Sequence, residues 1–387
     1  MSMVMEAAMA AWERGLSSVP DKSVCSSHID DYAVRLFIKR NGEMGTCDYC
    51  KKSRLVIDLD MLMEFLTDAL MHFFTDPANF MSYVSAEGGY LGDFDGPLEQ
   101  LEGLGLTVED EGLYEDMVNS FDHTSAWADE GSAASDFKYE GWLQFRHLVK
   151  HQSRYLFSPR KEMRLGDKAI SAESFLKELA GDIKRQRMIT VIKAGTPIYR
   201  CRQHASKNEV KYPRDICSPP IEHATFPNRM SSAGISMFYG ALDVRTAKLE
   251  TLNRLDSSKV YYTIATFFPK IDLKLIDLSK IPYVSPFDQE NWDLYDKVEF
   301  LFKFLDDFAK PVCHDGTEHI EYVPTQVITE YFRYKFYTSD KKPIDGIIYP
   351  SSKDRGRNAC VLFMDHYQSL DLLQCDEKFK VKKLTVK

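Results

Sequence analysis

Four residues near the start of the chain have the types and the spacing of a metal site. Cys25 and His28 form a C-x2-H pair, and Cys47 and Cys50 form a C-x2-C pair. Two such pairs of nitrogen and sulfur ligands complete a tetrahedral zinc site that leaves no position for water. The sequence therefore predicts a structural zinc ion held by these four side chains. The alternative is that three core thiols lie near a surface histidine.

Four blocks in the C-terminal half bring together an arginine, an aromatic residue, a glutamate and a pair of serines. They are IYRCR at 198–202, NRMSSAGISMFYGALDVRTAKLE at 228–250, EYVPTQVITEYF at 321–332 and DGIIYPSSKDRGRNACVLF at 345–363. In order and spacing these blocks resemble the RES domain family, across roughly residues 191–365. The resemblance implies a fold related to ADP-ribosyltransferases and cleavage of the nicotinamide–ribose bond of NAD.

The resemblance assigns roles residue by residue. The family arginine corresponds to Arg200, the glutamate to Glu250 and the aromatic residue to Tyr239. The family serine corresponds to Ser351, although the sequence does not separate it from the next serine. Further candidates for substrate binding lie in the same blocks and are Tyr199, Asn228, Arg229 and Ser352.

These residue types suit the reaction. Cleavage of an N-glycosidic bond passes through an oxocarbenium-like state, which the Glu250 carboxylate would stabilise. The planar guanidinium of Arg200 would bind the pyrophosphate of NAD, although Arg202 shares its face of the strand. Tyr239 would cover the nicotinamide or its ribose, and the Ser351 hydroxyl would position the substrate.

Arg146 and His151 suggest a second type of chemistry, because they form an R-x4-H motif like that of HEPN ribonucleases. An arginine and a histidine on one helix could stabilise a phosphorane and move a proton. The same spacing is also common on solvated amphipathic helices. The segment with the paired cysteines resembles the HEPN/RES N-terminal domain that is often fused to RES domains. Ribonuclease activity and transfer of ADP-ribose to a macromolecule are therefore the alternatives to hydrolysis of NAD.

The N-terminal half is predicted to be mostly helical. Apolar residues recur at three- and four-residue spacing in DYAVRLFIKRNG, MLMEFLTDALMHFF and FKYEGWLQFRHLVKHQSRYLF, and the chain starts with the apolar MSMVMEAAMAAWERGL. Residues 86–112 are rich in glycine and acidic residues, which predicts a long, partly mobile insertion. A last helix, SAESFLKELAGDIKRQR, follows a serine cap. We place the domain boundary after it, at residue 189.

The C-terminal half alternates short β-rich runs with helical patterns, which indicates a mixed α+β domain. The strand runs are TVIKAG, PIYRCR, ISMFYGA, KVYYTIATFF, LKLIDL, DGIIYPS and ACVLFMD, and the chain ends in a strand or tail, DEKFKVKKLTVK. Asp243 is the expected N-cap of a helix whose buried face carries Thr246, Ala247 and, two turns along, Glu250. The predicted fold class is α+β, with a helical domain over 1–189 and an ADP-ribosyltransferase-like RES domain over 190–387.

The composition of the chain limits the classes of partner that we expect it to bind. The chain has 387 residues, 44% of them hydrophobic, without the long apolar run that a membrane helix needs. Its eight cysteines are too sparse for a disulfide scaffold, and its net charge of −9 disfavours nucleic acid. We expect a cytoplasmic NAD glycohydrolase that acts as a toxin or antiphage-defence effector. It would be controlled in cis or by an antitoxin or trigger protein, and homo-oligomers stay open.

Overall fold

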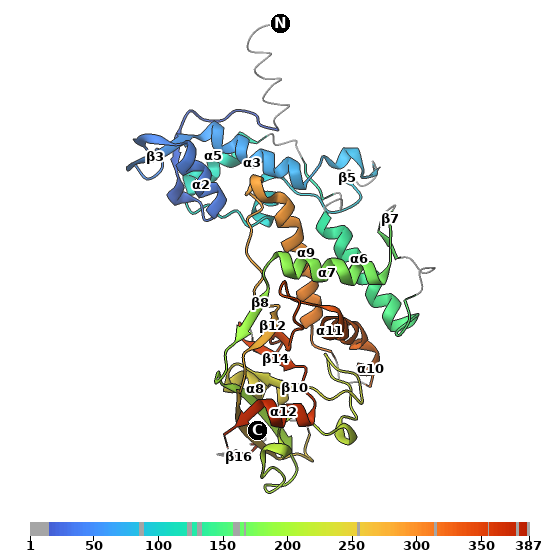
Figure 1. Cartoon of the computed structure of the whole chain (residues 1–387). Helices are drawn as coiled ribbons and strands as arrows, with labels where there is room; N and C mark the ends of the chain where they lie inside the picture. Colours follow the sequence, from blue (N-terminus) through green and yellow to red (C-terminus); the bar gives the residue numbers. More distant parts are fainter. Residues whose placement is uncertain are drawn as a thin grey trace. The chain divides into compact units, whose positions relative to one another are not determined.

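The computed structural model of the chain divides into two compact units (Figure 1). The first comprises residues 1–137 and 283–299, and the second comprises residues 138–282 and 300–387. The structure describes residues 15–84, 89–121, 126–129, 134–157, 163–165, 168–253, 256–312, 316–354, 356–376 and 379–384. The helix expected at the N-terminus lies almost wholly outside these residues. None of the described helices has the length and apolar character to cross a membrane.

The first unit combines helices with a small antiparallel sheet that the sequence analysis did not predict. Its strands pair in the order β1 (Ser23–Cys25), β3 (Ser53–Asp58) and β2 (Glu43–Thr46). Most residues of β2 and β3 are exposed, so no alternation of apolar and polar residues marks them. The helical elements are η1 (Ser26–His28), α2 (Tyr32–Asn41), α3 (Leu59–Phe73), η2 (Pro77–Asn79), α4 (Pro97–Gly103) and α5 (Glu111–Ser120), beside the short pair β4 (Tyr83–Val84) and β5 (Gly89–Tyr90).

The core of the first unit confirms the helices predicted from apolar spacing. Val34 and Ile38 of α2 pack against Leu62 and Leu66 of α3 within one buried cluster. The segment 283–299 completes this cluster, because Phe287 is buried in it. This late segment therefore belongs to the N-terminal core.

The prediction of a long mobile insertion over 86–112 is wrong for most of its length. Leu98 and Leu101 on α4, together with Leu106, are buried in the core of the first unit. The acidic and glycine residues around them dominate the composition and hide this short apolar repeat. Residues 85–88 lie outside the described part of the chain.

The second unit is built on one curled, mostly antiparallel sheet. The strand order is β15-β11-β9-β10-β14-β13-β12-β8, and β16 also pairs with β11. The only parallel pair among the described strands is β12 with β13. The strands are β8 (Ile189–Ile192), β9 (Ile198–His204), β10 (Phe238–Ala241), β11 (Tyr261–Pro269), β12 (Leu273–Asp277), β13 (Gly346–Pro350), β14 (Asn358–Leu362), β15 (Leu373–Cys375) and β16 (Lys380–Lys383). Each predicted strand is confirmed, including the terminal one.

Helices cover both faces of this sheet. On one face the apolar sides of four long helices meet Ile347, Tyr349 and Val361 in a single cluster. These helices are α6 (Ala134–His151), α7 (Ala172–Arg185), α9 (Trp292–Ala309) and α11 (Val323–Lys335). The other face packs under α12 (His366–Leu372). The other described elements of this unit are the hairpin β6 (Met163–Leu165) with β7 (Lys168–Ile170), the helices α8 (Val244–Thr251) and α10 (Glu318–Glu321), and the 3-10 turns η3 (Pro213–Asp215) and η4 (Ile221–His223). The 3-10 turn η5 (Gln289–Asn291) lies in the segment 283–299 and belongs to the first unit.

The compact units do not divide at residue 189. The helices α6 and α7 precede that position, yet Trp142, Phe145 and Phe175 are buried against Phe300 and Phe304 in the second unit. The predicted domain boundary at residue 189 therefore does not coincide with a boundary between the compact units.

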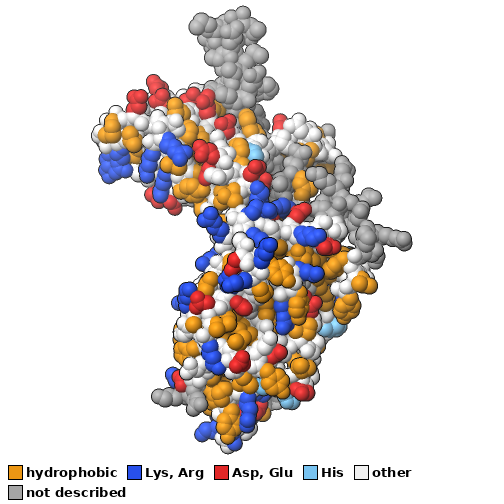
Figure 2. Space-filling model, in the orientation of Figure 1, with side chains coloured by type: hydrophobic (Ala, Val, Ile, Leu, Met, Phe, Trp, Pro, Cys, Tyr) orange, Lys and Arg blue, Asp and Glu red, His pale blue; other side chains and the backbone are white. Residues whose placement is uncertain are grey.

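Charged side chains of both signs are interspersed with apolar ones on the face of the molecule that Figure 2 shows. This mixture agrees with the modest net charge of the chain, which is −9.

Candidate functional site

Glu250 lies near the end of α8, as the sequence predicts. The helix begins where the Asp243 carboxylate accepts a hydrogen bond of 2.9 Å from the Thr246 backbone N–H. Thr246 and Ala247 are buried, and α8 packs on β9, β10 and β14. Glu250 is half-buried at the edge of this contact. The helix therefore delivers a carboxylate to the sheet, two turns from its cap.

The Ser351 hydroxyl orients the Glu250 carboxylate. Ser351 is buried just after β13, and its Oγ donates a hydrogen bond of 2.5 Å to Glu250 Oε1. The same Oγ accepts hydrogen bonds from the backbone N–H of Lys353, at 3.2 Å, and of Asp354, at 3.0 Å. The hydroxyl proton is thus directed at the carboxylate. This contact is made by Ser351 and not by Ser352, which the sequence could not separate.

Two tyrosines that the sequence analysis did not single out lie close to this carboxylate. Burial raises the pKa of Tyr349 on β13 well above its usual value, and the charge of Glu250 adds to the shift. Burial also raises the pKa of Tyr322, with smaller contributions from Glu318 and Glu250. The raised pKa values keep both phenols neutral at physiological pH, so neither adds a negative charge near Glu250. Both tyrosines stand in the quoted sequence blocks, but only folding shows that they approach Glu250.

Arg200 lies on β9 with an unused donor. Its Nη1 donates a hydrogen bond of 2.5 Å to the Tyr239 carbonyl, and the guanidinium lies 5.1 Å from the centre of the Phe238 ring. Among the residues that the structure describes, nothing pairs with its buried Nε. Burial lowers the pKa of Arg200 to about 10, so the side chain stays charged at neutral pH. A half-buried, charged and incompletely paired guanidinium fits an anionic ligand.

Strands β9 and β10 pair over a very short stretch beside Arg200. The only pair between β9 and β10 in the described sheet is Ala241 with Tyr199. The strands separate beyond that pair, and the Arg200 guanidinium reaches the Tyr239 carbonyl there. The split between β9 and β10 is what gives Arg200 access to the residues around Tyr239.

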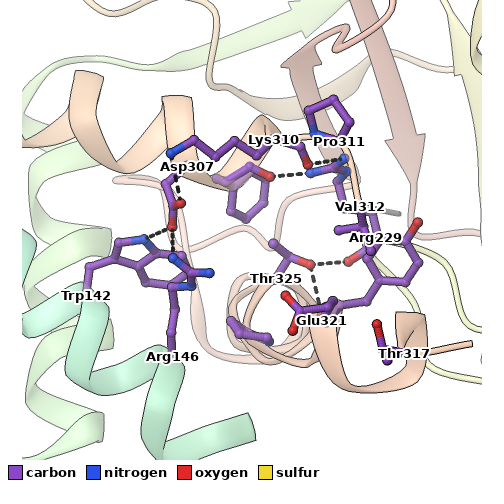
Figure 3. Close-up of a pocket in the computed structure, with 13 residues that line it drawn as sticks. Trp142, Arg146, Arg229, Asp307, Lys310, Pro311, Val312, Thr317, Glu321 and Thr325 are labelled. Carbon is purple, nitrogen blue, oxygen red and sulfur yellow. Dashed lines mark hydrogen bonds and ion pairs between the residues drawn. The ribbon is translucent and has the colours of Figure 1, made fainter. Parts of the chain in front are cut away.

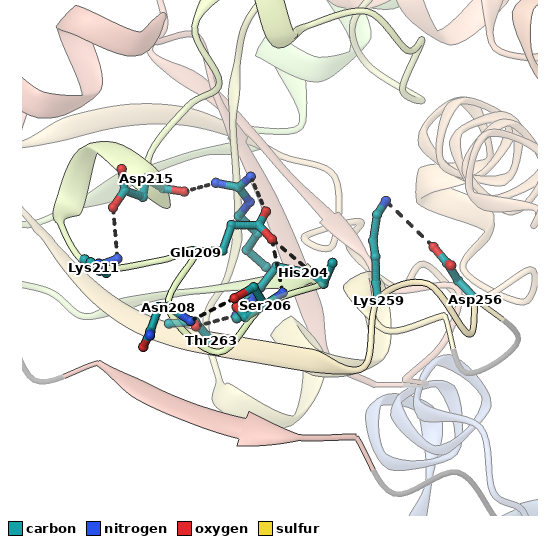
Figure 4. Close-up of polar contacts among 11 residues, drawn as sticks. His204, Ser206, Asn208, Glu209, Lys211, Asp215, Asp256, Lys259 and Thr263 are labelled. Atoms are coloured by element: carbon teal, nitrogen blue, oxygen red, sulfur yellow. Dashed lines mark hydrogen bonds and ion pairs between the residues drawn. The ribbon is translucent and has the colours of Figure 1, made fainter.

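Arg202, the rival on the same strand face, is occupied. It donates to the Asp215 carbonyl and forms an ion pair of 3.1 Å with Glu209. Figure 4 shows the surrounding network, in which the Asp215 carboxylate accepts the backbone N–H of Lys211 at 2.9 Å. The polar insert after β9 is therefore tied down by Arg202, which leaves Arg200 as the better candidate for a ligand.

Tyr239 is fixed by a hydrogen bond of 2.9 Å between its hydroxyl and Ser231 Oγ. Burial raises its pKa, so the phenol is neutral. Ser231 closes a tight turn with Asn228, and the side chain of Gln326 donates to the carbonyls of both residues, at 2.8 Å and 3.1 Å. Gln326, near the start of α11, therefore supports the loop that carries Ser231.

The secondary candidates have different environments. The Asn228 side chain is exposed. The Arg229 guanidinium donates to the carbonyls of Phe308 and Lys310, at 2.5 Å and 2.8 Å, and so holds the end of α9. Tyr199 packs beside Cys201 under α8. The structure therefore joins Glu250 with Ser351 and Arg200 with the Tyr239 backbone, whereas Arg229 is engaged by the protein itself.

The second unit contains a cleft of about 420 Å³ whose lining includes Arg229 but not Arg200, Tyr239, Glu250 or Ser351 (Figure 3). Tyr322 lines it, and the charge of Glu250 contributes to the raised pKa of this tyrosine. Its walls come from α6, the end of α9 and the start of α11, and they are Trp142, Arg146, Arg229, Asp307, Phe308, Lys310, Pro311, Val312, Thr317, Glu321, Tyr322, Pro324 and Thr325.

In the first unit, the predicted metal ligands come together. One ligand atom each from Cys25, His28, Cys47 and Cys50 lies within 4.8 Å of all the others. The Cys25 and Cys50 sulfurs are 3.8 Å apart, and Cys47 Sγ is 3.4 Å from His28 Nε2. These distances are those of four donors around one point, and a set of three thiols and one imidazole suits zinc.

The other ring nitrogen of this histidine has a carboxylate beside it. His28 Nδ1 lies 3.6 Å from an oxygen of Asp110, which precedes α5. A carboxylate on the far side of a histidine fixes which nitrogen faces the metal. Asp110 is a supporting residue that the sequence analysis missed, because it is distant in the chain from the four ligands.

Comparison with known families agrees with this architecture. Residues 40–163 match the HEPN/RES N-terminal domain 1, and residues 197–380 match the RES domain. No curated protein and no solved structure matches the chain. A RES domain implies a toxin-like function related to NAD, with NAD as the substrate. The chain therefore combines a HEPN/RES N-terminal domain with a RES domain, which carries the candidate active site.

Proposed function

We propose that the second unit hydrolyses NAD at the bond between nicotinamide and ribose. The observation that carries the proposal is the contact of 2.5 Å between Ser351 Oγ and Glu250 Oε1, which holds a carboxylate in one orientation beside neutral tyrosines. Charge stabilisation by a fixed group is effective where water is excluded, because the group need not reorganise during the reaction.

In this proposal the bond between ribose C1′ and the nicotinamide nitrogen breaks, and its electron pair leaves with nicotinamide, which becomes neutral. Glu250 stabilises the cation that develops on the ribose, and Tyr239 covers the nicotinamide ribose. Water then adds to C1′ and releases one proton, so the products are nicotinamide and ADP-ribose. Arg200 binds the pyrophosphate, for which its unpaired Nε supplies a donor.

We further propose that zinc binds Cys25, His28, Cys47 and Cys50. The three thiols and the imidazole fill a tetrahedral coordination shell, so the ion would be structural and would take no part in the reaction. It would hold β1 and the turn after β2 together in the first unit.

In the cell, hydrolysis of NAD without restraint would harm the producing organism. We therefore propose a toxin or defence effector in the cytoplasm, controlled by the N-terminal part of the chain, by an antitoxin or by a trigger protein.

The test is to incubate the purified full chain with NAD and to measure nicotinamide and ADP-ribose by chromatography. Equal amounts of both products support hydrolysis. Release of nicotinamide with radiolabel from the adenylate part left on a macromolecule would identify a transferase instead. Absence of nicotinamide release from a folded protein would overturn the proposal.

A further inference from the structure

We propose that Arg146, in the segment matching the HEPN/RES N-terminal domain, is a positioning residue for the RES site. It would act through an ion pair with Asp307, and the inference rests on the proposed cleavage of NAD. It gives one residue of the R-x4-H motif a role that differs from ribonuclease chemistry.

Asp307 is a buried carboxylate that is held by side chains of α6. Only 6% of its side chain is exposed, and Arg146 Nη1 donates to its Oδ2 at 2.6 Å. Trp142, one helical turn earlier on α6, donates its indole N–H to the same oxygen at 2.7 Å. Lys310 Nζ lies 3.4 Å from the other oxygen. A buried carboxylate that loses its main cation is left poorly compensated, so this group depends on α6.

Asp307 lies at the end of α9, next to the residues that bind Arg229. The next residue, Phe308, and Lys310 offer their carbonyls to the Arg229 guanidinium. A side chain from α6 therefore fixes the carboxylate, and the following carbonyls fix Arg229. Figure 3 shows Arg146 and Arg229 on either side of this helix end, around the same cleft.

Arg229 is connected to the candidate site through the turn 228–231. Arg229 lies within the turn that Asn228 and Ser231 close, and Thr325 donates its hydroxyl to the Arg229 carbonyl. Ser231 in turn contacts the Tyr239 hydroxyl at 2.9 Å. The turn 228–231 is thus held between the end of α9 and Tyr239. Movement at Asp307 is transmitted to the tyrosine that covers the nicotinamide ribose in our proposal.

A second ion pair also connects α6 to a segment that lines the cleft. Lys150, with 9% of its side chain exposed, forms an ion pair of 2.6 Å with Glu321, next to Tyr322. The helix therefore contacts both the end of α9 and the end of α10, which lies just before α11. Its two histidines, His147 and His151, are exposed and make no comparable contact with these segments in the described structure.

The experiment measures kinetics of the full chain with NAD for Arg146→Ala and Arg146→Lys. We expect Arg146→Ala to raise KM about tenfold and to change kcat less, because Tyr239 is displaced while Glu250 and Ser351 are not. Loss of folded protein alone would lower the apparent kcat and leave KM unchanged. Arg146→Lys should retain most of the wild-type KM, because a lysine can still pair with Asp307.

Two controls sharpen the result. Guanidinium at a concentration well below denaturing should lower the KM of Arg146→Ala, because the missing group can enter the cleft; sodium chloride at equal concentration should not. Lys177→Ala breaks an exposed ion pair of 2.9 Å with Glu173 on α7 and should leave KM unchanged. A KM for Arg146→Ala that equals the wild-type value, in folded protein, would overturn the inference.

Hydrogen exchange keeps the inference separate from the proposed function. Backbone amides of residues 229–231 and 239 should exchange faster in Arg146→Ala than in the wild type, with or without NAD cleavage. If the wild type does not cleave NAD and these amides still change, the proposed function fails and the coupling stands. If NAD is cleaved and the amides of Arg146→Ala exchange as in the wild type, the coupling is refuted.

Discussion

The contact between Ser351 and Glu250 joins two residues that are 101 positions apart in the chain. Neither residue is unusual alone, since a glutamate near a helix end and a serine after a strand are common surface residues. The contact makes them a unit, because the serine hydroxyl donates to the carboxylate and accepts two backbone N–H groups. Substitution of either residue should therefore affect the function of both.

Glu250→Gln should lower kcat about 100- to 1000-fold and leave NAD binding and melting temperature nearly unchanged. Glutamine keeps the shape and can still accept the Ser351 proton, so only the charge beside the cationic transition state is lost. Steady-state release of nicotinamide and calorimetric titration of NAD check this. More than about a tenth of the wild-type turnover would show that Glu250 is not the catalytic carboxylate.

Ser351→Ala should lower kcat by roughly tenfold, because a hydrogen bond to a charged group is lost and the carboxylate is no longer held. Ser352→Ala is the matched comparison, since it removes the same atom one position later. We expect it to have the smaller effect. The two variants are compared under identical conditions for nicotinamide release, and an equal loss in both would remove the distinction that the structure makes.

At the scale of the element, α8 matters because it carries Glu250 to the sheet. The helix is short, and its start depends on the Asp243 cap. The pKa of Asp243 is lowered, because the hydrogen bonds from Thr246 and Arg245 outweigh the effect of burial. This lowered pKa means that the stabilisation is present above the unfolded pKa of aspartate and is lost as the pH falls through the folded value.

Asp243→Ala should destabilise the chain by about 1 kcal/mol and also reduce kcat, since the cap sets the position of Glu250. Asp365→Ala removes the equivalent cap of α12, where Asp365 accepts the Gln368 N–H at 2.8 Å, away from Glu250. Both variants should lower the melting temperature by a similar amount. If Asp365→Ala lost as much turnover as Asp243→Ala, the effect would be one of stability alone.

At the scale of the whole molecule, the chain has two compact units with separate buried clusters. The Cys and His cluster belongs to the first unit and the candidate active site to the second. The two predicted functions, metal binding and NAD cleavage, are therefore carried by different cores. A change in one core need not remove the other function directly.

Protein purified without added zinc should contain about one zinc per chain, and Cys47→Ser should lose it. Chelation should lower the melting temperature of the first unit and leave that of the second unit unchanged in calorimetry, because the metal stabilises only the first unit. Cys375→Ser, in β15 of the second unit, should keep its zinc. Metal content below about 0.2 equivalents in the wild type would reject the site.

The sequence by itself predicted several long helices, most strands of the second unit and the identity of the candidate residues, but not the small sheet of the first unit. Apolar spacing located α2, α3 and α6, and a serine cap located the start of α7. β-rich runs located β8 to β14, and short-range pairs of cysteine and histidine indicated the metal cluster. These features are local, because a helix cap, an alternating strand and a C-x2-C pair each lie within a few residues. The four ordered blocks indicated the RES domain in the same way.

Only the tertiary structure decided which of these residues meet. It selected Ser351 over Ser352, occupied Arg202 and Arg229 with protein partners, and left Arg200 with an unused donor. It also brought Arg146 on α6 against Asp307, across the boundary predicted at residue 189. Such contacts depend on how sheet and helices pack, and packing joins positions that are far apart in the chain. No local pattern of residues encodes that information.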